Sequence, residues 1–179
     1  KCLRGETADP MAFNGPVYFE KESLTHHIEA KDGTALFKYH LLKQMLCCLF
    51  HDYAVALDHA SSGIKHIEAV TGMFVTPLYH FYHGLSLIGH LQEYGHDKAK
   101  IKSLKTILKK LKKWKKTAPE NHDHRYHLVE AGYWDVIGNV ENARISFGKA
   151  IRAAQENSFV QDTALIYESA GRFHRKMGE

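Results

Sequence analysis

Apolar residues recur every three or four positions along most of the chain, which is the spacing of a helix that buries one face. The segment from 97 to 117 shows the pattern most clearly, with Ile101, Leu104, Leu108 and Leu111 on one stripe. The pattern predicts about seven helices, over residues 34–50, 52–70, 75–94, 97–117, 122–137, 140–156 and 158–177. Strand-like alternation never extends beyond a few residues, and only four prolines interrupt the chain. We therefore predict an all-α fold.

The residues between the apolar stripes indicate where helices begin and end. Asp52 and Asp97 stand at predicted helix starts. Pro119 and Asn121 mark a predicted loop, and Gly138 is typical of the turn that follows a helix. Because the predicted connections are short, consecutive helices are expected to pack as antiparallel hairpins.

The hairpins repeat along the chain. Ala56, Ala99 and Ala143 fall into register at intervals of 43 and 44 residues. Small residues follow at most of the positions four and seven places later, as two closely packed helices require. The third unit is closest to a tetratricopeptide pattern. The residues expected to pack the repeats are Ala56, Ala99, Trp134, Gly138, Ala143, Phe147 and Ala150. The repeat predicts a right-handed superhelix of antiparallel helical hairpins, a tetratricopeptide-like α-solenoid.

This repeat also predicts the organisation of the chain. Residues 1–33 are expected to be an irregular lead-in from a preceding repeat. The hairpins are expected over residues 34–72, 74–117 and 122–156, followed by a capping helix at 158–177. Since the chain begins at Lys1, we interpret it as a piece of a longer protein.

One predicted helix carries most of the positive charge. Between Lys98 and Lys116 there are ten lysines and no acidic residue, whereas elsewhere acidic residues outnumber basic ones by 20 to 14. This face is either a solvated surface or a contact for an acidic protein, an anionic membrane surface or nucleic acid. Nucleic acid is disfavoured because no arginine is interleaved. The candidate protein-interaction residues are Lys102, Lys105, Lys109, Lys112 and Lys116.

No motif for catalysis, a cofactor or a metal stands out. No serine lies in a GXSXG turn, HEXXH is absent, and the paired histidines His80 and His83 fall in a different unit from His122, His124 and His127. We therefore predict no catalytic, cofactor-binding or metal-ligating residue. A small metal-binding protein is the alternative that the fourteen histidines keep open.

The sequence also predicts where the protein works. Three cysteines without a framework pattern favour a reducing, cytoplasmic compartment. No apolar run approaches the length of about 18 residues that a membrane span needs. We expect a protein partner, no nucleic acid and no membrane span, and the pattern leaves self-association open.

Three stretches resemble a known family: Gly5-Glu6-Thr7 with Asn14-Gly15, the segment from Phe50 to Leu57, and above all the segment from His124 to Ala170. They are similar to the helical-repeat region of very large multi-domain signalling kinases. Those proteins join a serine/threonine-kinase-like domain, an AAA-type ATPase module, this region, a GAF domain and a histidine kinase.

The resemblance implies that the kinase and ATPase motifs belong to other domains, so this segment is no enzyme. It implies a structural role for His124 and Glu130, which match positions that the family tends to keep. It also indicates that His51 replaces a more usual turn glycine. The expected function is a non-catalytic protein-interaction and interdomain-coupling segment of an intracellular signal-transduction kinase. The alternative is a stand-alone docking adaptor that uses its groove or its lysine-rich helix.

Overall fold

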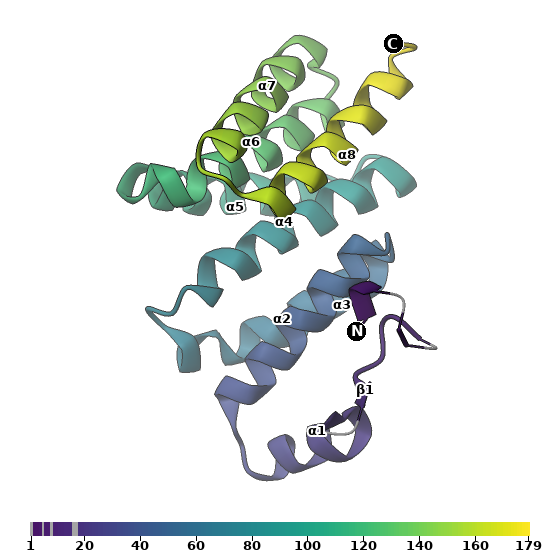
Figure 1. Ribbon diagram of the computed structural model, residues 1–179, viewed down its shortest axis with the longest axis vertical. Helices are drawn as coiled ribbons and strands as arrows, with labels where there is room; N and C mark the ends of the chain where they lie inside the picture. The colour runs from purple at the N-terminus through teal and green to yellow at the C-terminus, as the bar shows by residue number, and fades with distance from the viewer. Residues whose placement is uncertain (1, 5, 8, 16–17) are drawn as a thin grey trace. The chain divides into compact units, whose positions relative to one another are not determined.

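The computed structural model describes residues 2–4, 6–7, 9–15 and 18–179, and these residues fold almost entirely into helices (Figure 1). The α-helices are α1 (Glu20–Glu29), α2 (Gly33–Leu49), α3 (Tyr53–Gly63), α4 (Val75–Tyr94), α5 (Lys98–Thr117), α6 (Pro119–Val136), α7 (Val140–Glu156) and α8 (Val160–Lys176). Two 3₁₀ helices, η1 (Cys2–Arg4) and η2 (Ile64–Val70), and two short strands, β1 (Asn14–Gly15) and β2 (Tyr18–Phe19), complete the described elements. The expectation of an all-α fold is confirmed.

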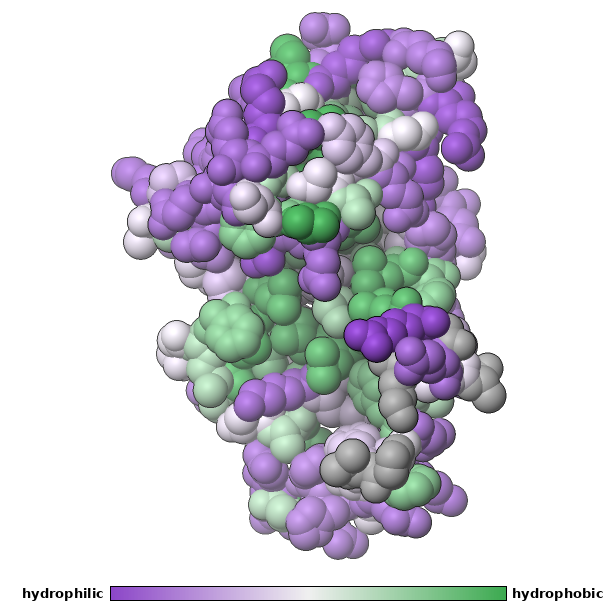
Figure 2. All heavy atoms as spheres, in the orientation of Figure 1, coloured by the Kyte–Doolittle hydropathy of each residue, from purple (hydrophilic) through white to green (hydrophobic). Residues whose placement is uncertain are grey.

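The chain divides into two compact units, Lys1–Ser86 and Leu87–Glu179, which we call the N-terminal and C-terminal units. The division falls inside α4, so the first part of this helix belongs to one unit and its last part to the other. On the face drawn in Figure 2, hydrophilic side chains predominate over α7, whereas hydrophobic ones gather over part of the N-terminal unit.

The N-terminal unit is built on α2, which packs against α3 and η2. Its core joins Phe37 and Leu41 of α2 with Ala60 of α3, Val70 of η2 and the start of α4. Tyr79 of α4 is almost completely buried, and its hydroxyl donates to the Ala60 carbonyl oxygen over 2.8 Å. This hydrogen bond offsets the free-energy cost of burying the phenol hydroxyl, and it connects α4 to α3 within the unit.

In the C-terminal unit, α5, α6 and α7 each pack against the next helix along the chain, and α6 also contacts α8. Gly138 makes the turn between α6 and α7 with a φ of 79°, a conformation that favours glycine. Helix α7, which begins after this turn, buries a row of alanines: Ala143, Ala150 and Ala154 are fully buried. Small side chains let the helix axes approach closely.

Several helix boundaries follow from local chemistry as the sequence predicts. The Asp52 carboxylate accepts from the Val55 backbone N–H over 3.2 Å, and that of Asp97 accepts from Ala99 over 2.8 Å. Each satisfies an otherwise unpaired amide at a helix N-terminus. His51, which the resemblance predicts to stand in place of a turn glycine, has a φ of 65°, in the left-handed region that favours glycine.

Three predictions about local structure are wrong. Residues 1–33 are not irregular throughout, because α1 occupies Glu20–Glu29; this helix buries no residue fully, so its apolar spacing carries little signal. The helix expected over 52–70 ends at Gly63 and continues as the 3₁₀ helix η2. Pro119 lies in no loop but begins α6, where its missing N–H leaves no helical hydrogen bond unmade.

Candidate functional site

Helix α5 places one apolar face in the C-terminal unit and leaves the other in solvent. Its buried residues are Ile101, Leu104, Ile107 and Leu111, and this face packs against α6. Burying four large aliphatic side chains holds the helix in place. The opposite side is therefore available as a surface without any loss of packing.

All five candidate interaction residues lie on the exposed side of α5: Lys102, Lys105, Lys109, Lys112 and Lys116. We call this set the lysine face. Lys105 also lies over the Tyr133 ring of α6, with its Nζ 5.8 Å from the ring centroid. Among the described residues, the ion pairs include none made by the other four lysines. The lysine face therefore presents positive charge that its own unit does not neutralise.

Lys115 shows what a neutralised lysine looks like on the same helix. Its Nζ lies 2.8 Å from an Asp123 carboxylate oxygen and 2.7 Å from Nε2 of His127, both on α6. It also lies over the Tyr126 ring, 4.8 Å from the centroid. Because its ammonium group is paired with residues of α6, Lys115 does not belong to the lysine face.

Glu130 of α6 is the centre of a polar network that joins α6 to α7. Its carboxylate accepts from the Tyr126 hydroxyl over 2.6 Å, from Nδ1 of His127 over 2.9 Å and from the Ser146 hydroxyl over 3.0 Å. Burial alone would raise the pKa of this carboxyl, but the three hydrogen bonds and the nearby His127 lower its pKa to about 2. We call these four residues the Glu130 network.

His124, the other residue that the resemblance singles out, is completely buried in α6. Its Nε2 lies 2.6 Å from a carboxylate oxygen of Asp162 in α8, and Arg125 donates to the same oxygen over 2.8 Å. The ring stacks on Phe159 with centroids 4.2 Å apart. The hydrogen bonds and the positive charge of Arg125 outweigh burial and lower the pKa of Asp162. His124 thus connects α6 to α8.

The residues expected to pack the repeats differ in their burial. Ala56, Ala143, Phe147 and Ala150 are buried. Trp134 is partly buried, and Gly138 forms the turn described above. The expectation for Ala99 is wrong, because this residue is exposed in the first turn of α5. The helix turns its large aliphatic residues inward instead, since they gain more from burial than a methyl group does.

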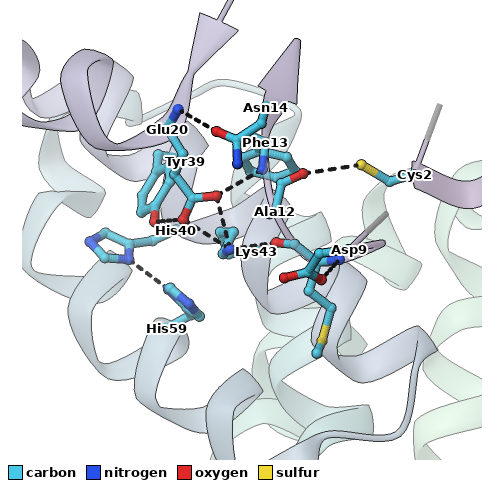
Figure 3. Close-up of polar contacts among 11 residues, drawn as sticks. Cys2, Asp9, Ala12, Phe13, Asn14, Glu20, Tyr39, His40, Lys43 and His59 are labelled. Carbon is cyan, nitrogen blue, oxygen red and sulfur yellow. Dashed lines mark hydrogen bonds and ion pairs between the residues drawn. The ribbon is translucent and has the colours of Figure 1, made fainter. Parts of the chain in front are cut away.

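Sequence reasoning missed a second polar network, in the N-terminal unit (Figure 3). The Glu20 carboxylate accepts from the Tyr39 hydroxyl over 2.7 Å and from the Phe13 backbone N–H over 2.8 Å, and Lys43 Nζ lies 3.0 Å from it. These contacts outweigh the effect of burial and lower the pKa of Glu20. We call Glu20, Tyr39, Lys43 and Phe13 the Glu20 network. Its members come from segments far apart in sequence, so no spacing pattern reveals it.

A pair of histidines lies beside that network (Figure 3). Nδ1 of His40 in α2 is 3.0 Å from Nδ1 of His59 in α3, so one ring donates and the other accepts. Burial, followed by the charges of His59 and His66, lowers the pKa of His40 to about 4. The two rings therefore form a neutral pair that ties α2 to α3.

The described residues contain no group of three or more His, Cys, Asp or Glu side chains that could hold a metal ion. Within the same part of the chain, no helix combines the length and the apolar character needed to cross a bilayer. Gly5, in the first stretch that carries the family resemblance, lies outside the described residues.

Comparisons with protein-family models, with curated proteins and with solved structures find no match for this chain. The resemblance of the three sequence stretches to signalling kinases therefore stays a prediction.

Proposed function

We propose that this chain is a non-catalytic protein-interaction segment that docks an acidic protein partner on the lysine face of α5. The observation that carries the proposal is the division of α5 into a buried aliphatic face and an exposed face of lysines. A surface charge that is not paired within its own unit attracts a partner of opposite charge and raises the rate of encounter.

The chemistry of α5 favours a protein over the other two anionic partners. A helix that binds a membrane surface needs its apolar face for the lipid, but Leu104, Ile107 and Leu111 are at most 4% exposed. Binding of single-stranded nucleic acid commonly uses exposed aromatic rings, and Trp114, the aromatic residue of α5, is partly buried. Lysine ammonium groups can pair with carboxylates on a protein surface, and this pairing needs neither an exposed apolar face nor exposed aromatic rings.

We further propose that the helices continue as tetratricopeptide-like hairpins in a superhelix and that the segment couples flanking domains of a cytoplasmic signalling kinase. The packing of α5 through α8, each on its chain neighbour, supports the hairpin part. The family resemblance supports the kinase part. A stand-alone docking adaptor is the alternative, and it would use the same lysine face.

The experiment compares two triple variants of the full chain with the same change in net charge. One replaces Lys109, Lys112 and Lys116 by Glu, and the control replaces the exposed Lys21, Lys65 and Lys149 by Glu. The probe is a glutamate-rich peptide as long as α5, titrated at low and at moderate salt. We expect the first variant to lose binding at least tenfold and the control to keep it.

Two results would overturn the proposal. An equal loss of peptide binding in both variants would mean that binding depends only on the net charge of the chain. Tighter binding to phosphatidylserine vesicles or to a DNA duplex than to the peptide, at the same salt concentration, would assign the lysine face to a different class of partner. Circular dichroism of both variants keeps unfolding apart from loss of binding.

A further inference from the structure

The N-terminal unit contains a cavity of about 520 Å³, a volume that suits a small organic molecule. It lies between the chain before α1 and the first half of α2. Its walls are mainly apolar, and aromatic rings from both segments contribute. The lining residues that matter below are Phe13, Tyr18, His27, Ala35, Lys38, Tyr39 and Leu42.

The aromatic walls of the cavity hold one another in place. Phe13 meets Tyr18 edge-on with ring centroids 6.4 Å apart, and it meets Tyr39 edge-on at 6.1 Å. Tyr18 in turn stacks on His27 of α1, at 6.3 Å. Edge-to-face pairs of this kind are attractive beyond simple burial, so the three aromatic rings and His27 form a wall with a defined shape.

The segment over the cavity is also tied down by polar contacts, which Figure 3 shows. The Glu20 network holds the Phe13 backbone, and Lys43 donates to the Met11 carbonyl oxygen. The Cys2 thiol donates to the Ala12 carbonyl oxygen over 3.7 Å. These contacts are all made within the chain, so the protein's own residues hold the wall in position for a ligand.

The described lining of the cavity carries a positive charge. Lys38 of α2 is an exposed lining residue, and the described lining residues include no Asp or Glu. The partly buried Glu20 carboxylate, which accepts a hydrogen bond from the lining residue Tyr39, is paired with Lys43. An apolar wall with an ammonium group at its edge complements a molecule with an apolar body and one negative charge.

We propose that this cavity binds a small apolar carboxylate, with its hydrocarbon body against Phe13 and Leu42 and its carboxylate at Lys38. This binding site is independent of the lysine face, which belongs to the C-terminal unit. The apolar walls supply affinity, and Lys38 selects the anionic form of the ligand.

The test uses three probes with the same hydrocarbon body: decanoate, decanol and decylammonium, each titrated into the full chain by calorimetry. We expect decanoate to bind tightest and decylammonium weakest. Lys38→Gln should weaken decanoate binding about twofold to fivefold and leave decanol binding unchanged, since an exposed charge contact has about this value. Lys21→Gln, an exposed lysine outside the lining, is the matched control and should change neither.

Two more variants locate the binding. Ala35→Phe should fill the cavity and abolish binding of decanoate and decanol alike, with the helical content checked by circular dichroism. Leu42→Glu, at a side chain that is already 46% exposed, should weaken decanoate more than decanol. The proposal is overturned if no probe binds, if all three probes bind equally, or if binding survives Ala35→Phe in a folded protein.

Discussion

The Glu20 and Glu130 networks use the same chemistry in the two units of the chain. Each carboxylate side chain is 21% exposed, and each accepts from a tyrosine hydroxyl at 2.6–2.7 Å. A lysine lies over an aromatic ring of each network: Lys43 lies over Phe13, and Lys115, which is outside the Glu130 network, lies over Tyr126. A partly buried carboxylate is tolerated in both because charged and neutral donors surround it.

The two networks differ in what they connect. Glu130 joins two regular helices, because its partners Tyr126 and His127 lie on its own helix and Ser146 lies on α7. Glu20 fastens the non-helical chain around Phe13 onto α2. Because the segment around Phe13 lies outside the contact between α2 and α3, we expect the Glu130 network to stabilise its whole unit and the Glu20 network to stabilise only a local segment.

The largest expected effect comes from Glu130→Gln. An amide keeps one acceptor but faces the Tyr126 hydroxyl, His127 and Ser146, so at least one buried donor loses its partner. We expect a loss of about 2–3 kcal/mol in the free energy of unfolding, measured by urea denaturation. Because the pKa of Glu130 is about 2 in the folded protein, its stabilisation is present above pH 4.5 and is lost as the pH falls towards 2. A variant as stable as the parent at pH 7 would contradict this role.

The next effect separates two alanines that the repeat places in equivalent positions. Ala143→Leu should overfill the contact between α6 and α7 and lower the unfolding free energy by about 1–3 kcal/mol. Ala99→Leu should change it by less than about 0.5 kcal/mol, because that side chain is exposed. Thermal melts of both variants check the difference. Equal shifts in the two melting temperatures would show that α5 packs as the repeat predicts.

A smaller effect is expected on stability: the stability of the N-terminal unit should depend on pH through His40. The folded N-terminal unit keeps His40 neutral down to about pH 4, whereas the unfolded chain protonates near pH 6.5. Protons are therefore taken up on unfolding, and the contribution to stability is lost as the pH falls from 6.5 to 4, by about 1 kcal/mol after solvent screening.

Hydrogen exchange at pH 7.0, 5.5 and 4.5, corrected for intrinsic rates, tests this pH dependence. Amides of α2 and α3 should lose protection across that range while those of α6 and α7 keep it. Charges outside the pair also act on it: His66 and Lys65 on His40, and Lys43, Glu20 and Asp58 on His59. Burial and Lys43 lower the pKa of His59 too. The double variant His40→Gln/His59→Gln should abolish the difference; a slope that persists there would assign it to other groups.

The smallest effect is expected from Glu20→Gln, at about 0.5–1 kcal/mol. The measurable change should lie in the amides of residues 9–15 and 18–19, which should exchange faster while α2 and α3 stay protected. Decanoate binding should weaken as well, because the wall of the cavity is no longer held by the Glu20 network. A loss of protection throughout the N-terminal unit would erase the contrast with Glu130.

Much of the fold could be predicted because helix formation depends on neighbours in sequence. The boundaries of α4 and α7 match the predicted segments, and Asp97 caps α5 as its position indicates. α1 escaped prediction because it buries no residue fully. Ala99 was misplaced because spacing along a helix identifies a face but does not say which face meets a neighbour.

The sequence by itself determined the helical class, most helix boundaries and the amphipathic character of α5, since these follow from hydrogen bonds and apolar spacing within a few residues. The tertiary structure alone decided which polar groups meet. Glu20 reaches Lys43 across 23 residues, and His124 reaches Asp162 across 38. Burial and hydrogen bonding depend on distances between helices, which only the packed chain sets. For the same reason the Glu20 and Glu130 networks, and the cavity beside the first of them, emerge only from the folded protein.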